Sequence, residues 1–512
     1  MNEVQTVRLP PYDAAIYLSG DTSLRDATMT SYPQDAVAAG PSRTEPVGWR
    51  LASLSLSMLL ASLGTSIANV GLPSLAEAFS ASFQEVQWVV LAYLLAITTL
   101  IISIGRLGDI VGRRKLLLGG IALFTLASAL CGVAPFLPWL VAARVLQGLG
   151  AAAMMTLAMA LVGEAVPKQK TGSAMGLLGT MSAIGTALGP SLGGALIAGF
   201  GWQAIFLVMV PAGLLALFLA HRALPAGHPA SRPTRSGFDL AGTLLLAATL
   251  GTYALSMTIG RGAFGMTNLM LLLMAIVGMC LFLFVESRAA SPLVRLSMLR
   301  EPVLRSGLAT SMLVATVMMT TLVVGPFYLS RGLGLSAALV GLVMSAGPVV
   351  SALAGVPAGR FVDRFGARRM AVAALGIMAT GCLALSLVPE PFGVAGYVMP
   401  LVTLTTGYAL FQVANTTGVM KDARPEQRGT VSGLLNLSRN LGLITGASVM
   451  GAIFSFAAAS EAAAAGSAAA AAGMRATFAV ATVLVVFAAA IAAANRAHAA
   501  NPTPQEVSVA GK

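Results

Sequence analysis

The chain has 512 residues, of which 57% are hydrophobic and only 10% are charged, and its formal net charge is +12 at pH 7. A soluble domain has about a quarter of its residues charged, so this composition excludes a water-covered surface and requires extensive contact with lipid. In a soluble protein the positive charge would suggest nucleic acid. Here the Lys and Arg residues lie in short loops between apolar runs, which indicates membrane topology and no nucleic-acid partner.

Both ends of the chain are predicted to be tails outside the membrane. Residues 1–49 lack an apolar core, so they predict a disordered cytoplasmic tail and not a signal peptide. Residues 496–512 predict a second cytoplasmic tail. The domains expected between them are an N-terminal six-helix bundle over 50–220, a linker with a two-helix insert over 221–302, and a C-terminal six-helix bundle over 303–495.

Apolar runs of the length that spans a membrane, about 20 residues, occur about fourteen times. The runs are continuously apolar and do not alternate, which favours helices over a β-barrel. The predicted spans are 51–71, 86–105, 115–134, 137–161, 172–198, 204–220, 239–259, 268–285, 303–326, 337–357, 370–388, 394–418, 430–456 and 475–494. The Ala-rich stretch 457–473 is predicted to be a loop, although alanine could also prolong a helix. The expected fold is an all-α integral membrane protein.

The basic residues predict its orientation. An even number of spans places both termini on one side of the membrane, and most of the Lys and Arg residues outside the spans lie in loops on that side. The opposite loops carry only Arg261, Arg331 and Arg475. The positive-inside rule therefore predicts cytoplasmic termini, in the inner membrane of a bacterium.

An internal repeat relates the first six spans to the last six. The matched positions are Gly105, Asp109, Gly112 and Arg114 with Gly359, Asp363, Gly366 and Arg368, and Gly172, Gly176, Gly185, Gly189 and Gly194 with Gly429, Gly433, Gly442, Gly446 and Gly451. Two related halves around a site at the membrane midplane are typical of secondary transporters. The seventh and eighth spans would then be an insert between the halves.

The loop after the second span predicts a cytoplasmic gate. Glycines permit a tight turn there, and Asp109 can cap the next helix and pair with an arginine. Such a pair could hold the cytoplasmic side shut in one state and break in the other; the alternative is a basic loop that only sets topology. The gate residues are Gly105, Asp109, Gly112, Arg113 and Arg114 with Gly359, Asp363, Gly366 and Arg368.

The fourth span contains an arginine. Because a charge within a span is costly, Arg144 should face the bundle interior, and helical spacing puts Gln147 and Gly148 on its face. One interpretation is a role in coupling transport to protons or substrate. The other is a structural arginine bonded to backbone carbonyls.

The fifth span is rich in glycine. Small residues at regular steps let two helices touch closely, and a proline bends or loosens the helix, so this segment could seal a leak or act as a hinge. Ordinary helix packing is the plainer alternative. The residues concerned are Gly176, Gly185, Gly189, Pro190, Gly193 and Gly194.

Together these three motifs resemble the major facilitator superfamily over roughly residues 51–495, and the fourteen spans resemble its drug:proton antiporter branch. The loop motif is common to that superfamily, the Arg144-x-x-Gln147-Gly148 pattern resembles its proton-coupled members, and the glycine pattern of the fifth span resembles its antiporter motif. The resemblance implies export of small molecules, driven by a proton gradient and without a cofactor. A periplasmic adaptor protein is a further partner that it allows without requiring.

One position departs from that branch. An Asp often lies five residues before the Asn of Asn69-Val-x-Leu-Pro73, and here that position is Gly64. No Asp or Glu lies in the middle of a predicted span. If protons are coupled, the residues expected to carry them are Asp109, Glu85 or Glu164 together with Arg144 and Gln147; otherwise the substrate's own charge must serve.

Polar side chains within spans are candidates for a substrate cavity. They are Asn69, Tyr93, Gln412, Asn415, Asn436, Arg439 and Asn440. Arg439 has no counterpart in the first half, where the repeat places Ser182, so it is a candidate for contacting an anionic or carbonyl group of a substrate. An interhelical hydrogen bond is the alternative for this side chain.

Three functions are open. The first is proton-coupled export of small apolar compounds or drugs, and the second is transport of one metabolite, such as an amino acid, sugar or siderophore. The third is a membrane-embedded enzyme, but the sequence shows no catalytic constellation, no metal-ligand spacing and no phosphate-binding loop. The antiporter-like motif favours export.

Overall fold

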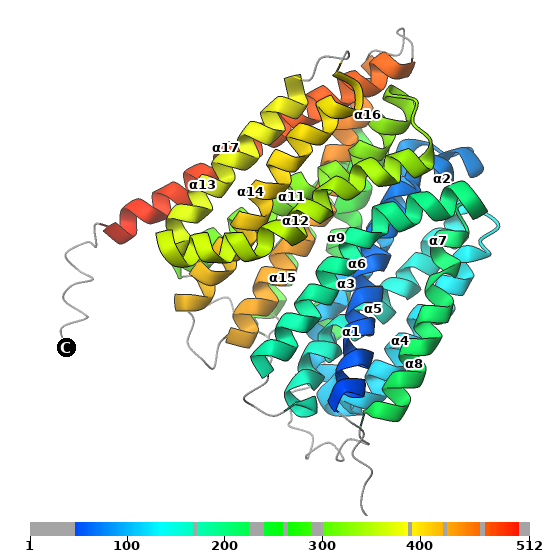
Figure 1. The fold of residues 1–512 in the computed structure, drawn as a ribbon, viewed down its shortest axis with the longest axis vertical. Helices are drawn as coiled ribbons and strands as arrows, with labels where there is room; N and C mark the ends of the chain where they lie inside the picture. Colours follow the sequence, from blue (N-terminus) through cyan, green and yellow to red (C-terminus); the bar gives the residue numbers. More distant parts are fainter. Residues whose placement is uncertain are drawn as a thin grey trace, which may run out of the picture. The chain divides into compact units, whose positions relative to one another are not determined.

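The structure is a computed structural model that describes residues 47–166, 171–224, 240–259, 265–288, 298, 301–387, 392–422, 428–460 and 466–500. Most of the predicted N-terminal tail and the last part of the C-terminal tail fall outside these ranges. Within them, the long elements are all helices (Figure 1). An all-helical fold satisfies every backbone hydrogen bond within its own segment, as the lipid interior requires.

Eight helices form the first half of the described chain. They are α1 (Val47–Val70), α2 (Leu72–Ala78), α3 (Phe83–Val111), α4 (Arg113–Gly132), α5 (Leu137–Ala165), α6 (Thr171–Phe200), α7 (Ala204–Leu207) and α8 (Met209–Ala223). Two helices follow as the insert, α9 (Leu240–Thr258) and α10 (Met266–Arg288). The second half comprises α11 (Pro302–Phe327), the π-helical turn η3 (Tyr328–Gly332), α12 (Ala337–Phe365), α13 (Ala367–Leu387), α14 (Gly393–Asp422), α15 (Arg428–Thr445), the π-helical turn η6 (Gly446–Met450), α16 (Gly451–Ser460) and α17 (Gly466–Ala500).

The described residues contain 14 helical segments that are long and apolar enough to cross a membrane, which confirms the predicted number. One local prediction was wrong. The Ala-rich stretch was expected to be a loop, but α16 runs to Ser460 and α17 already begins at Gly466. Alanine has the highest helix propensity of all residues, so a run of alanines next to a span prolongs the helix.

The two halves repeat the same packing. In the first half α1 packs against α5, α6 and α8, and α5 also packs against α3 and α4. In the second half α11 packs against α14, α15 and α17, and α13 packs against α14 and α17. The predicted pair of six-helix halves is therefore present, and the contact of α1 with α6 has its counterpart in that of α11 with α15.

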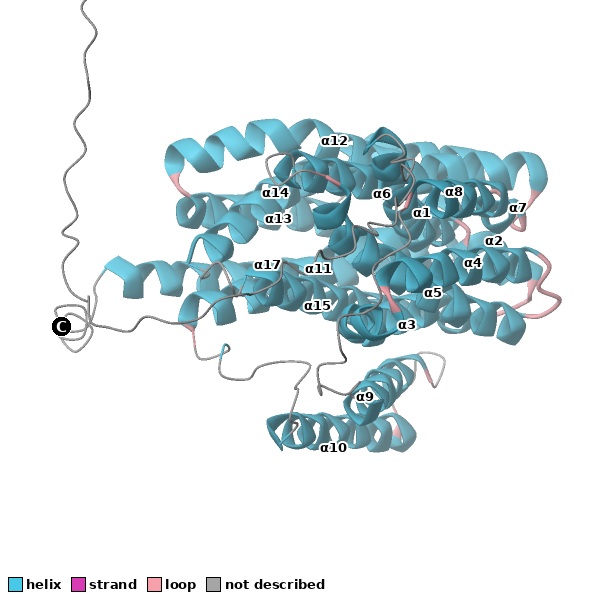
Figure 2. Cartoon of the chain, turned by 90° about the horizontal axis from the view of Figure 1, so that it is seen from below, coloured by secondary structure: helices cyan, strands magenta, loops and turns pink. Residues whose placement is uncertain are grey.

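The insert lies to one side of the other helices (Figure 2). α10 packs against α9, and α9 packs against α3. Two hydrogen bonds join α9 to α3: Trp88 Nε1 donates to Thr258 Oγ1 at 3.1 Å, and the hydroxyls of Ser103 and Thr243 lie 2.7 Å apart. On its other side α9 contacts the second half, where Tyr253 Oη donates to Thr445 Oγ1 of α15 at 3.3 Å. The insert is thus held by both halves.

The halves also touch each other at the end of the bundle where α3 begins, which is the end opposite the predicted cytoplasmic loops. Phe83 of α3 lies 4.5 Å from Phe327 of α11 and 5.1 Å from Phe454 of α16, measured between ring centroids. Beside this aromatic cluster, Gln84 Nε2 donates a hydrogen bond to Ser455 Oγ. We call these five residues the outer seal.

Candidate functional site

A cavity of about 350 Å³ lies between the two halves. Residues from α6 line it on one side, and residues from α11, α12, α14 and α15 line the rest. Most of the lining is apolar or small, with residues such as Met318, Leu322, Met344 and Leu443. Binding pockets for small molecules typically have volumes of about 300–1,000 Å³ and few polar groups, so this central cavity is the candidate substrate site.

One face of α14 supplies more polar groups to the central cavity than any other helix. Tyr397, Thr405, Tyr408 and Gln412 all line it, as does Leu401 between them. These residues recur at steps of three, four or eight, so they form a stripe along one side of the helix. The sequence analysis had found only Gln412; the polar stripe within an apolar span was the signal that could have revealed Tyr397 and Thr405.

Arg439 of α15 lines the central cavity from the second half. It is the only charged side chain among the described residues that line it. Its repeat counterpart Ser182 lines the same cavity from α6, where its hydroxyl lies 2.6 Å from that of Ser62 of α1. The repeat therefore brings two equivalent positions to one cavity with very different chemistry.

Other residues expected at the cavity lie elsewhere. Tyr93 is fully buried and donates a hydrogen bond to the carbonyl of Ala61 at 2.7 Å. Asn69 is buried too, and its amide donates to the carbonyls of Thr65 and Ser66 on its own helix. Neither residue is among those that line the central cavity, and the hydrogen bonds of both go to carbonyls of α1. Asn436 and Asn440 of α15 are partly buried and are also not among its lining residues.

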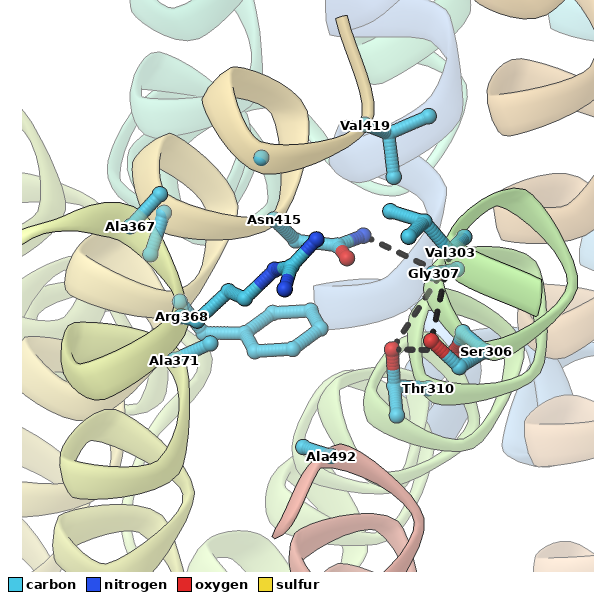
Figure 3. A pocket seen from close by; sticks show the side chains of 13 residues that line it. Val303, Ser306, Gly307, Thr310, Ala367, Arg368, Ala371, Asn415, Val419 and Ala492 are labelled. Carbon is cyan, nitrogen blue, oxygen red and sulfur yellow. Dashed lines mark hydrogen bonds between the residues drawn. The ribbon is translucent and has the colours of Figure 1, made fainter. Parts of the chain in front are cut away.

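Asn415 lines a second, much smaller cavity, of about 50 Å³, within the second half (Figure 3). Its Nδ2 donates to the carbonyl of Gly307 of α11 at 3.1 Å. Arg368, from the predicted gate motif, extends across this cavity toward Asn415. A cavity of this size can hold water but not a substrate. Its place beside the gate motif makes it part of the contact among α11, α13 and α14.

Arg144 of α5 is fully buried inside the first half, with partners for all three of its nitrogens. Nε donates to the carbonyl of Val89 at 2.7 Å, Nη1 to Gln147 Oε1 at 2.5 Å, and Nη2 to the carbonyl of Gly64 at 3.1 Å. The guanidinium also lies over the ring of Tyr93, 4.1 Å from its centroid. Arg144 thereby joins α1, α3 and α5.

Gln147 continues this network as the predicted shared helix face requires. Its Nε2 donates to Ser128 Oγ of α4 at 2.7 Å. A Cβ atom at Gly148 would lie 2.6 Å from the carbonyl oxygen of Tyr93, so the glycine lets α5 and α3 approach closely. No acidic side chain takes part in these contacts of the described residues, and the guanidinium charge is met by backbone carbonyl dipoles and a π-face. This geometry matches the structural interpretation of Arg144; a coupling role stays a prediction.

The glycine motif of α6 forms a close helix contact, as predicted. A Cβ atom at Gly185 would collide with the carbonyl of Leu59, one at Gly189 would lie 2.7 Å from Ser66 Cβ, and one at Gly193 would lie 2.7 Å from Val70 Cγ1. All three neighbours belong to α1. Glycine at these positions is required by the distance between the two helices.

Gly194 makes the corresponding approach to the other half. A Cβ atom there would lie 2.6 Å from the carbonyl oxygen of Ala337 and 2.9 Å from Gly341 Cα, both of α12. Pro190 lies inside α6 one turn earlier, where it has no N–H to donate to the helix. At the equivalent place in the second half, the π-helical turn η6 interrupts the span, and Ala447 replaces the proline. Both spans are therefore loosened at the same repeat position by different means.

The two gate loops share one backbone feature. Gly112, between α3 and α4, has φ +99°, and Gly366, between α12 and α13, has φ +87°. Side chains are disfavoured at such angles, so both glycines are needed for the turn. Arg114 Nη2 donates to the carbonyl of His221 at the end of α8, at 2.7 Å. Asp363 is exposed.

Several predicted residues cannot be placed, or have a different local role. The side chains of Asp109 and Glu164 lie outside the described part of the structure, and Gly176 belongs to α6 but its surroundings are not described. Glu85 is exposed at the start of α3, where it accepts hydrogen bonds from the backbone N–H and the hydroxyl of Ser82, both at 2.7 Å. This is a capping box, which stabilises the helix end.

Comparison with known proteins gives consistent matches. The sequence profile of the Major Facilitator Superfamily matches residues 54–447. Multidrug resistance protein Stp of Mycobacterium tuberculosis is 32% identical over 408 residues, which are 79% of this chain and 75% of that protein. Riboflavin transporter RibZ of Clostridioides difficile is 28% identical over 402 residues, 78% of this chain and 87% of that protein.

Solved structures agree on the fold. A bacterial homologue of the human lysosomal transporter Spinster, crystallised in an inward-facing and occupied conformation, aligns with a TM-score of 0.65 at 17% identity. The alignment covers 88% of this chain and 96% of that one. These relatives and fold neighbours are transporters, so the hypothesis of a membrane-embedded enzyme is set aside. With two six-helix halves, a central cavity and a matching profile over most of its length, this chain belongs to the Major Facilitator Superfamily and is a multi-span membrane transporter of small molecules.

Proposed function

We propose that this transporter exports small, largely apolar molecules from the cytoplasm across the bacterial inner membrane. The observation that carries the proposal is the central cavity, which lies between the halves and offers an apolar lining with one polar stripe and one charge. Such a lining binds molecules by apolar contact and orients them through few hydrogen bonds. The glycine motif of α6 supports export, because it resembles an antiporter motif.

Transport would proceed by alternating access, with the halves rocking about the central cavity. The outer seal closes the end of the bundle where α3 begins, through Phe83, Phe327 and Phe454. Opening toward the outside requires these rings to separate, while the gate loops at Gly112 and Gly366 approach at the cytoplasmic side. Both termini are cytoplasmic in this proposal.

A proton gradient would supply the energy. No acidic residue lines the central cavity in the described part of the chain, so a proton site would lie elsewhere. Asp109 and Glu164 are the carboxylates proposed to carry protons, with Arg144 and Gln147 transmitting the change between α1, α3 and α5. Glu85 is the weaker candidate because it already caps α3. A periplasmic adaptor remains optional.

The alternative is transport of one metabolite by the same fold. Stp is named a multidrug resistance protein, which supports a broad exporter, whereas RibZ is named a riboflavin transporter, which supports a narrow one. The two functions differ in how many unrelated molecules share the central cavity. Its apolar lining, which includes five methionine or leucine side chains, favours the broader range.

Dye efflux tests the proposal. Cells expressing the chain would be loaded with ethidium, neutral Nile red, or fluorescein delivered as its diacetate, and the loss of each dye followed with and without a protonophore. Protonophore-sensitive loss of at least one dye is expected. Arg288→Gln, an exposed arginine on the insert, is the matched control and should export normally. No loss of any dye from inserted protein would favour the metabolite transporter, and loss insensitive to the protonophore would contradict proton coupling.

A further inference from the structure

Three polar atoms in the central cavity have no hydrogen-bond partner among the residues that the structure describes. They are Tyr397 Oη, Thr405 Oγ1 and Arg439 Nε. Tyr397 and Thr405 are almost completely buried, with 0% and 1% of their surfaces exposed. Buried polar groups in proteins nearly always have a hydrogen-bond partner. Three atoms without one around a single cavity indicate a ligand that supplies the missing partners.

The charge of the cavity lining indicates the charge of this ligand. Arg439 is the only charged side chain on the described lining, and no carboxylate is present to balance it. On the helices beside it, the acidic residues are Glu301 at the start of α11, Asp363 near the end of α12 and Asp422 at the end of α14. Glu301 and Asp363 are exposed, and the side chain of Asp422 lies outside the described part of the structure. A cation within a membrane bundle is costly unless an anion or several acceptors surround it. Because no acidic residue lines the described part of the cavity, a negatively charged group of a ligand is the partner that would compensate Arg439 most fully.

Arg439 is the donor that can hold an anionic group, because arginine presents a fork of N–H donors that matches the oxygens of a carboxylate. Tyr397 lies at another level of the cavity: its hydroxyl is close to Gly325 near the end of α11, whereas Ser438, next to Arg439, bonds to Leu308 near the start of that helix. The Tyr397 and Thr405 hydroxyls can therefore donate to other polar groups of the same molecule. Tyr397 also packs against Tyr328, with ring centroids 6.0 Å apart. On the opposite wall, Ser182 and Thr186 of α6 are already hydrogen-bonded to their own neighbours. The charge recognition thus comes from the second half alone.

We infer that the central cavity selects organic anions, with an apolar body against Met318, Leu322 and Met344 and an acidic group on Arg439. This inference rests on the proposed export function and names its substrate class. Ammonium-bearing compounds would meet the Arg439 charge without a compensating acid, so they would be bound more weakly than anions of the same shape.

Two xanthene dyes of similar shape and opposite charge test the inference: fluorescein, an anion, and rhodamine 123, a cation. Binding would be measured by fluorescence polarisation on the purified full-length transporter in lipid nanodiscs. Wild type should bind fluorescein at least about tenfold more tightly than rhodamine 123, because hydrogen bonds to charged groups contribute that much or more. Arg439→Gln should abolish this preference, Arg439→Lys should keep part of it, and Tyr397→Phe and Thr405→Val should each weaken fluorescein binding a few-fold.

Arg288→Gln removes the same charge from an exposed position on α10 and should leave both affinities unchanged. Equal affinity for the two dyes, no fluorescein binding by folded wild type, or a preference that survives in Arg439→Gln would each overturn the inference. Transport of the same dyes into proteoliposomes tests the proposed export function separately from the inferred anion site. Arg439-dependent binding without transport would overturn export and leave the anion site, whereas transport of both dyes regardless of Arg439 would leave export and overturn the anion site.

Discussion

Nη2 of Arg144 lies 3.1 Å from the carbonyl oxygen of Gly64, so the arginine of α5 is hydrogen-bonded to the backbone of α1. A Cβ atom at Gly64 would lie 2.8 Å from Tyr93 Oη, the hydroxyl that bonds to Ala61 on the same helix. The position where a related branch often carries an Asp is therefore filled by the tyrosine and the arginine. The first half is held together there without a carboxylate.

Arg144→Lys should reduce transport at least tenfold while the protein still inserts in the membrane. Lysine keeps the charge but has one ammonium in place of a guanidinium fork, so it cannot reach Val89, Gly64 and Gln147 together. Arg144→Ala should abolish coupled transport. Initial rates in proteoliposomes, normalised to inserted protein, measure both effects. Full proton-driven activity in Arg144→Ala would remove this residue from the mechanism.

Gly189→Ala should destabilise the contact between α1 and α6 by about 1–3 kcal/mol, because overpacking a tight contact forces the helices apart. The added Cβ would lie 2.7 Å from Ser66 Cβ. Gly199→Ala, at an exposed position in the same helix with nothing within 4 Å of its Cβ, is the matched control and should be nearly neutral. Thermal unfolding in detergent compares the two. Equal midpoints would mean that the α6 glycines are not required by packing.

Gly366→Ala should cost about 1–3 kcal/mol through backbone strain alone, since its φ of +87° is disfavoured for a side chain although no atom stands in the way. Gly359→Ala, in the same motif but inside α12 and with open space around it, should be neutral or slightly stabilising. Thermal unfolding in detergent compares the midpoints of the two variants. If both variants behaved alike, the gate motif would not depend on the conformation of its turn.

Asp109→Asn should cripple transport without preventing membrane insertion, because the gate hypothesis requires a charged partner for a nearby arginine. Asp363→Asn changes the equivalent residue in the second half, which is exposed, and should have the smaller effect. Transport rates and surface labelling of inserted protein would be measured together. Undiminished transport by well-inserted Asp109→Asn would contradict the gate hypothesis.

The spans and the glycine contacts could be predicted from the sequence because each depends on local information. An apolar run of sufficient length must cross the membrane, and glycines at regular steps are useful only where helices touch. The rotation of each helix could not be predicted in this way. Asn69 and Tyr93 were expected at the cavity, yet both point into the first half, where their hydrogen bonds lie on α1. Helix rotation and tilt are set by packing between helices, which sequence spacing does not encode.

Arg439, in contrast, could be singled out from the sequence. Its lack of a counterpart in the first half singled it out, because a difference within a repeat is visible in the sequence. Tyr397 and Thr405 were missed although they share a helix face with Gln412. A tyrosine and a threonine fit easily into an apolar span, so only the cavity distinguishes them from lipid-facing or packed residues.

A crosslink across the outer seal should stop transport reversibly. Gln84 of α3 and Ser455 of α16 are hydrogen-bonded to each other across the two halves. In a Gln84→Cys/Ser455→Cys variant, a short reducible thiol-to-thiol crosslinker would hold the outer end closed, and transport should fall to background until a reductant cleaves the link. Of the native cysteines Cys131 and Cys382 are buried and Cys280 is exposed on α10, so wild type and each single variant serve as controls. Transport that continues at the normal rate with the crosslink in place would mean that the outer end need not open, and alternating access about the central cavity would be wrong.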